Sequence, residues 1–364
     1  MCAAIEHRPL GGMGQTGHAR PAFTRGLSLV ELMVGLVVGL LVSLAAGGSA
    51  QLFNATQRQG LGVGSGSVNA ASALAAIKGD VANVGLGFFG DSKYGCASLN
   101  LSTGITLRSN GAVFSPVQAT RSGANDVLDI VYGSEVSAGA AVPLALSSTG
   151  SDATLASLLP ATVGQAVLLA PLDGVSSCTV RSVTATTVPT AADKQLLSFG
   201  AAGSHNQVAF TTPVTYPAKS LAALLGTLQW NRYSVASGNL VITRVLDGST
   251  AILLRNVIAL RIEYGTSAAA AGSTTLDAWQ DPSDVGWTAI GSGNIARVRA
   301  LRIGIVVRSA QREKANASGT CEASSAKPVL FSNTIEPDVT DWRCYRYRSA
   351  VIVAPLRNVV YGLK

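Results

Sequence analysis

The strongest pattern in the chain is an apolar stretch close to the N-terminus. Residues 32–50 carry no charged side chain, and about 20 such residues are needed for a helix to cross the hydrocarbon core of a membrane. Arg20 and Arg25 precede the stretch, and basic flanks tend to stay on the cytoplasmic side. The pattern therefore predicts a membrane-spanning helix over residues 27–50, with the bulk of the chain on the far side of the membrane.

Helix-compatible sequence continues beyond the apolar stretch, over residues 51–85. Glycines stand at alternate positions within it, from Gly60 to Gly66, and each costs about 0.5–1 kcal/mol in a helix interior. We therefore expect one long N-terminal helix that is weakened or interrupted at these glycines and resumes to about Ala82.

The pattern changes after residue 86 to short apolar runs rich in Val, Ile, Leu and Thr, set between Gly, Ser, Asn and Pro. Such runs are typical of β-strands. In one of them, VASGNLVITR, the residues Ser237, Gly238 and Asn239 predict a hairpin turn. The predicted fold class is α+β: a long N-terminal helix, transmembrane in its first half, packed on a β-rich C-terminal domain over residues 86–364.

The C-terminal run SAVIVAPLRNVV, residues 349–360, is apolar and β-prone. At the edge of a sheet its backbone would be open to a strand from a partner. Inside a sheet it would be a core strand instead. We favour the core strand and keep the edge strand as the alternative.

Glu31 stands at the start of the apolar stretch, where a carboxylate in lipid is costly. A cut between Gly26 and Leu27 explains its position, because the new α-amino group would lie four residues before Glu31, near a helix N-terminus. When such helices pack side by side, the amine of one subunit could pair with the carboxylate of its neighbour. The alternative is an ordinary signal anchor that contains a stray acid.

The stretch G-LSLVELMVGLVVGLL resembles the class III signal of type IV pilins and pseudopilins. The resemblance implies that Gly26 precedes the cut made by a prepilin peptidase, that Leu27 is the new, N-methylated terminus, and that Glu31 is the subunit-assembly acid. Leu27 departs from the Phe that is commoner at this position. Residues 1–26 are then a leader that is removed, although Met13 is an alternative start.

Sequence blocks farther along the chain indicate which family within the type IV pilins the chain resembles. In order, they are AAIKGDVANVGLGFFG, NDVLDIVYGSE, LLRNVIALRIEYG, VRALRIGIVVRSAQRE and RYRSAVIVAPLRNVV. This succession resembles that of PilW-type minor pilins. The resemblance implies a pilin-like fold and a minor pilin that primes or caps type IV pilus assembly. The implied partners are other minor pilins, the major pilin and prepilin peptidase, with a large tip adhesin as a further candidate.

The implied location is the bacterial inner membrane, with the helix in lipid and the bulk in the periplasm, and then the pilus tip on the cell surface. A bulky outer domain suits a tip because it cannot repeat many times along a thin fibre. Two alternatives remain open: the larger minor pseudopilin of a type II secretion system, and a membrane-anchored periplasmic enzyme or binding protein.

Four cysteines follow the apolar stretch: Cys96, Cys178, Cys321 and Cys344. Beyond a membrane they would lie in an oxidising compartment, and four cysteines allow three pairings. We prefer Cys321–Cys344, because closing this modest loop contributes roughly 3 kcal/mol in a chain-entropy model, and this leaves Cys96–Cys178. None of the four forms a CxxC pair, so the spacing does not predict a zinc site.

The remaining features indicate no chemistry. The net charge of +7 is spread along the chain, so no nucleic-acid partner is predicted. His205 lies in a turn-like segment without a nucleophile elbow, and we expect a solvated loop residue. Asp277, Asp281 and Asp284 do not have EF-hand spacing, and we expect a surface loop or a partner contact. No enzyme activity, catalytic residue, metal or cofactor is therefore predicted.

Overall fold

The computed structural model describes residues 29–90, 93–94, 96–135, 137–190, 193–269 and 273–362. The predicted leader and the cleavage site at Gly26 and Leu27 lie outside these residues. Contacts divide the chain into two units, residues 1–59 and residues 60–364, and each is described by itself.

Helix α1 (Leu29–Asn83) supplies the described part of the first unit. Its apolar side chains from Leu29 to Leu44 are 52–77% exposed. Among the described residues, no helix has a stretch long and apolar enough to span a membrane. The helix continues through Gly60 and Gly66, so α1 shows no interruption at these glycines.

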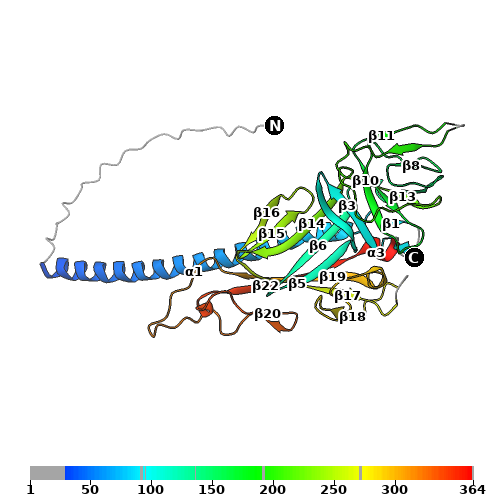
Figure 1. The fold of residues 1–364 in the computed structure, drawn as a ribbon. Coiled ribbons are helices and arrows are strands. Elements are labelled where there is room, and N and C mark those ends of the chain that lie inside the picture. Colours follow the sequence, from blue (N-terminus) through cyan, green and yellow to red (C-terminus); the bar gives the residue numbers. More distant parts are fainter. Residues whose placement is uncertain are drawn as a thin grey trace, which may run out of the picture. The chain divides into compact units, whose positions relative to one another are not determined.

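In the second unit, the last turns of α1 bury one face. Ala70, Leu74, Ile77 and Val81 are buried, and their spacing of three or four residues places them on one side of a helix. Lys78, beside this face, is exposed. These turns run between two β-sheets (Figure 1).

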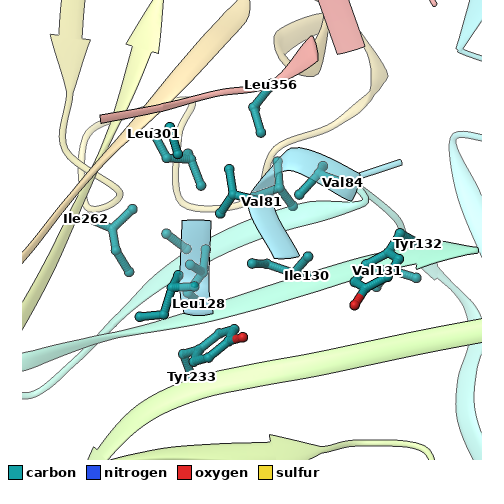
Figure 2. Close-up of a cluster of buried hydrophobic side chains, with 14 of the residues drawn as sticks. Val81, Val84, Leu128, Ile130, Val131, Tyr132, Tyr233, Ile262, Leu301 and Leu356 are labelled. Atoms are coloured by element: carbon teal, nitrogen blue, oxygen red, sulfur yellow. The ribbon is translucent and has the colours of Figure 1, made fainter. Parts of the chain in front are cut away.

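The buried face of α1 is the centre of the main core. In Figure 2, Val81 lies between Ile130 of one sheet and Leu301 of the other, with Leu356 close by. Burying a side chain of this size contributes about 1.5–3 kcal/mol. The helix therefore fills the space between the two sheets and holds them together.

The first of these sheets has five antiparallel strands. In spatial order they are β16 (Thr250–Arg255), β15 (Asn239–Arg244), β14 (Leu228–Ala236), β6 (Asn125–Gly133) and β5 (Val117–Ser122). The predicted hairpin is confirmed between β14 and β15, where Ala236 pairs with Asn239. Its turn residues Ser237 and Gly238 have φ values of 48° and 70°, as a two-residue type I′ turn requires.

The second sheet has four antiparallel strands. In spatial order they are β18 (Ala278–Gln280), β17 (Val257–Thr266), β19 (Val298–Arg308) and β22 (Tyr347–Pro355). One face packs on α1, and the short strands β20 (Val329–Leu330) and β21 (Asn333–Thr334) cover part of the other face. Gly304 permits this cover, because a Cβ there would lie 2.7 Å from Leu330 Cδ1.

A third sheet has six strands and its own core. In spatial order they are β4 (Thr106–Val113), β3 (Ser98–Thr103), β10 (Cys178–Ser182), β9 (Ala166–Ala170), β13 (Leu221–Gly226) and β7 (Ala141–Pro143), and β10 pairs with β3 in parallel. A smaller sheet of β11 (Ala185–Thr186), β12 (Leu196–Ser198) and β8 (Asp152–Thr154) packs beside it. The remaining elements are β1 (Phe89–Gly90), β2 (Lys93–Tyr94), α2 (Ser292–Ile295), a 3₁₀ turn (Trp342–Cys344) and α3 (Arg357–Gly362). The predicted β-rich character is confirmed.

Asp80 fixes the end of α1 against the five-stranded sheet. Its carboxylate accepts hydrogen bonds from the Tyr132 hydroxyl at 2.9 Å, and from Asn231 Nδ2 and the Tyr233 hydroxyl at 2.6 Å each. Burial and the Asp80 charge raise the pKa of both tyrosines, so both hydroxyls remain donors. Because apolar packing has no preferred direction, these bonds set the rotation of the helix.

Asn358 fixes the same helix end from the other side. The last carbonyl groups of a helix lack partners within the helix. The Nδ2 group of Asn358, in α3, donates to the carbonyl oxygens of Ala82 at 3.4 Å and Val84 at 3.1 Å. The last helix of the chain therefore caps the first.

His205 is buried, so the prediction of a solvated loop residue is wrong. Its side chain is 7% exposed, its Nδ1 lies 2.7 Å from the carbonyl oxygen of Ser102, and its backbone N–H donates to Ser182 Oγ at 3.1 Å. Burial lowers its pKa below the ordinary value of 6.5, although the hydrogen bond with Ser102 acts in the opposite direction. The surrounding turn-like sequence gave no sign of this, because β3 and β10 supply the contacts.

Replacing Asp80 tests the anchoring of α1. Asp80→Ala removes three hydrogen bonds to a charged acceptor, each of which contributes roughly 1.5–3 kcal/mol, so it should lower the free energy of unfolding by at least about 3 kcal/mol. Urea unfolding of the full chain in detergent micelles, followed by tryptophan fluorescence, measures the change. Lys78→Ala, on the exposed side of the helix, is the control and should shift it by less than about 0.5 kcal/mol. Equal effects of the two substitutions would contradict the anchoring role.

The buried histidine predicts a pH dependence. A folded-state pKa below 6.5 means that the unfolded chain takes up a proton first as the pH falls, so folding stability falls with it. The free energy of unfolding should decrease from about pH 7.5 to about pH 5.5, and His205→Gln should flatten this slope. Urea unfolding at each pH measures it, and an unchanged slope in the variant would show that other groups cause the dependence.

Candidate assembly surfaces

The residues predicted to carry N-terminal assembly lie at the start of the chain. Gly26 and Leu27 are outside the described residues, and Glu31 lies in the first turns of α1. Cleavage, methylation and the pairing of Glu31 therefore stay predictions.

The first unit presents an apolar surface, formed by the Leu, Val and Met side chains from Leu29 to Leu44, all more than half exposed. A surface of this kind is normally covered by lipid or by another protein. Gly35 and Gly39 lie within it, and a Cβ at either position would meet nothing within 4 Å. Small residues four apart let a second helix approach closely, so this surface fits packing against neighbouring helices.

Two disulfides stabilise the second unit. Cys96 bonds to Cys178, with 5.4 Å between their Cα atoms, and Cys321 bonds to Cys344, with 4.8 Å. This is the pairing preferred from the loop lengths. The first joins the segment after α1 to β10, and the second closes a loop between β19 and β22.

The segment between β19 and β22 is held by ion pairs as well as by its disulfide. Arg308 Nη1 lies 2.7 Å from Asp338 Oδ1, and Arg312 Nε lies 2.6 Å from Asp341 Oδ2. Pairs at the surface contribute little individually, but the Arg308 pair connects the segment to β19 and the Arg312–Asp341 pair joins the two ends of the segment to each other. The segment therefore stays in place over the outer face of β19.

The C-terminal run divides between two elements: residues 349–355 lie in β22, at an edge of the four-stranded sheet, and residues 357–360 lie in α3 instead of continuing the strand. Within the described part of the chain β22 pairs with β19 alone, so for these residues the core strand that we favoured is wrong and the edge alternative is confirmed. Ala350 and Ile352 pack on the core, whereas Val351 and Val353 on the opposite face are 48% and 47% exposed. Edge strands with exposed β-branched side chains accept a strand from a partner readily.

The acidic loop is tied together by its own carboxylates. Asp277 Oδ2 accepts from the Ala268 N–H at 2.7 Å, Asp284 Oδ2 accepts from the Asp281 N–H at 2.9 Å, and Asp281 Oδ2 accepts from Arg121 Nη2 at 2.6 Å. In the described part of the chain, no three potential metal ligands gather. The three carboxylates hold the loop to itself and to β5.

Comparison with known proteins gives a family match in the region of these surfaces. Residues 231–358 match the PilW family, type IV pilus-assembly protein W. The match runs from Asn231, which contacts Asp80, to Asn358, which caps α1, and it includes β22. Comparison with curated proteins gives no match.

Among solved structures, a type IV-like pilin from Thermus thermophilus matches with 9% identity and a TM-score of 0.34, over 81% of this chain and 96% of that chain. The resemblance that the sequence blocks indicated is confirmed over residues 231–358, which match the PilW type IV pilus-assembly family.

Proposed function

We propose that this protein is a minor pilin that primes or caps type IV pilus assembly. The observation that carries the proposal is the match of residues 231–358 to the PilW pilus-assembly family. The class III signal at Gly26 and Leu27 and the exposed apolar surface of α1 support it. The protein acts by packing and contact rather than by catalysis.

The N-terminal helix supplies the assembly step. Before assembly, inner-membrane lipid covers the side chains from Leu29 to Leu44. After the leader is removed, the α-amino group of Leu27 and the carboxylate of a neighbour's Glu31 attract each other in a medium of low dielectric constant. Removing one member of such a buried pair costs about 3–5 kcal/mol, so the pair selects helices that are in register.

The second unit supplies the contacts at the tip. Its size suits a position that occurs once per fibre, and its partners are other minor pilins, the major pilin and, as a further candidate, a large adhesin. The protein therefore starts in the inner membrane with its bulk in the periplasm and ends at the pilus tip on the cell surface.

The mature N-terminus tests the processing step. Mass spectrometry of the protein purified from its own membrane should find a chain that begins at N-methylated Leu27. Gly26→Val should block the cut, because a side chain there obstructs the peptidase, whereas Gly17→Val, farther upstream in the leader, should not. A mature chain beginning at Met1 or Met13 would rule this processing out.

Pilus counts test the assembly role. Deleting the gene should sharply reduce surface pili while the major pilin accumulates in the inner membrane. Glu31→Ala and Glu31→Gln should leave cleavage intact but lower incorporation by roughly tenfold or more, because each leaves an amine without its partner. Normal piliation in the deletion strain would refute the priming role, and full incorporation of both Glu31 variants would refute the pairing. If the deletion instead blocked export of folded proteins, the type II secretion alternative would replace the pilus.

A further inference from the structure

A cavity of 510 Å³ lies where α1, β16, β19 and β22 meet in the second unit. This volume is within the range of about 300–1,000 Å³ that is typical of ligand sites. Helix α1 contributes two polar side chains to the lining, those of Asn69 and Ser72. None of the described lining residues is acidic. Four of them are arginines: Arg255, Arg308, Arg346 and Arg348.

Two of these arginines are held in place by partners outside the cavity. Arg308 pairs with Asp338 at 2.7 Å and lies over the Tyr345 ring, with 4.9 Å from its Cζ to the ring centroid. Arg346 pairs with Glu313. Both guanidinium groups are therefore pre-positioned, with their charges partly neutralised.

The other two arginines are uncompensated. Arg255 and Arg348 are exposed, and no ion pair or hydrogen bond joins their side chains to a residue that the structure describes. Arg348 pairs across the sheet with Val307, which belongs to the core that packs on α1. Directly paired residues share a face of a sheet, so Arg348 lies on the α1 side. Two unneutralised guanidinium groups thus border a single cavity.

Two open sheet edges flank the cavity. β16 is an edge of the five-stranded sheet and β22 is an edge of the four-stranded sheet. Ile252 on β16 is 49% exposed, similar to Val351 and Val353 on β22. An extended peptide can pair its backbone with such an edge and place alternate side chains on either face.

We propose that this arginine cavity binds a carboxylate side chain on an extended segment of another pilus subunit, and that the segment adds a strand to β22. The identity of the partner as a pilus subunit rests on the proposed function. Guanidinium groups bind carboxylates through paired, charge-assisted hydrogen bonds. A peptide uses the cavity, the free backbone edge and the exposed valines together, whereas a free phosphate or a lipid headgroup uses only the charge. The observations therefore favour an acidic segment of a protein.

The direct test uses the full-length protein in nonionic detergent and two peptides. An acetylated and amidated Glu-Val-Glu-Val-Glu peptide supplies both the carboxylates and the β-forming backbone, and Gln-Val-Gln-Val-Gln supplies only the backbone. Fluorescence anisotropy should show that the Glu peptide binds at least roughly tenfold more tightly, and that added salt weakens it. Equal affinity for the two peptides would overturn the proposal without requiring any variant.

Variants locate the binding. The double variant Arg255→Glu and Arg348→Glu should reduce affinity for the Glu peptide by roughly tenfold or more. Arg357→Glu, an exposed arginine of α3 outside the cavity, makes the same kind of charge reversal and should leave binding unchanged. Changing Arg255 and Arg348 to Lys keeps the charge but loses the paired hydrogen bonds, so affinity should fall less than in the double Glu variant, and the binding that remains shows that the site is folded. Loss of binding in Arg357→Glu to the same extent would overturn the proposal.

Inorganic phosphate and phosphatidylglycerol vesicles separate the ligand sources. If either binds the wild type but not the double Glu variant, while the Glu peptide fails to bind, the cavity is a phosphate or lipid site and the proposal is wrong.

Piliation distinguishes the cavity proposal from the proposed minor-pilin function. If deletion reduces pili and the double Glu variant restores them fully, the cavity has no assembly role while the minor-pilin function stands. Normal piliation after deletion would refute the minor-pilin function. The peptide affinities alone would then decide whether the cavity binds carboxylates.

Discussion

Burial of one face of α1 between two sheets is the interaction on which the rest of this structure depends. Leu74, Ile77 and Val81 occupy the space that neither sheet closes by itself. Hydrophobic burial is non-directional, so it does not decide how far the helix turns or slides. Asp80 on one side and Asn358 on the other remove this freedom. The positions of both sheets, and of the edge strands beside the helix, follow from these contacts.

The same helix has two kinds of apolar surface. Near its C-terminal end the apolar side chains occur on one stripe and are buried within the domain. From Leu29 to Leu44 they surround the helix and are exposed. A helix that is apolar all round requires lipid or other helices around it, whereas a stripe requires one neighbouring domain. This difference in periodicity separates the segment that folds with its own chain from the segment that needs partners.

Local patterns in the sequence predicted what local physics decides. Ser237 and Gly238 between alternating apolar residues specify a two-residue turn, and the hairpin has it. The environment of His205 could not be predicted in this way, because strands about 20 and 100 residues distant bury it. The sequence left the edge position of β22 as the less favoured alternative, since an apolar run looks alike at an edge and in a core.

The arginine cavity gave only a partial signal in the sequence. Arg346 and Arg348 are two residues apart in a strand-like run, which places them on one face. Arg255 and Arg308 join them only through the register of β17, β19 and β22. Strand register is set by the whole domain, so the charge balance of such a site can be judged only from the fold.

The cap that Asn358 places on α1 has a consequence for the order in which the chain folds. Asn358 lies 275 residues beyond Asn83, the last residue of α1, so the ribosome makes the cap long after the helix. At roughly 5–20 residues per second, that synthesis takes on the order of tens of seconds. During this time the stripe formed by Leu74, Ile77 and Val81 has neither β19 nor α3 to cover it. The burial of α1 therefore depends on strands and a helix that are synthesised late, and until they are made its apolar stripe is open to aggregation.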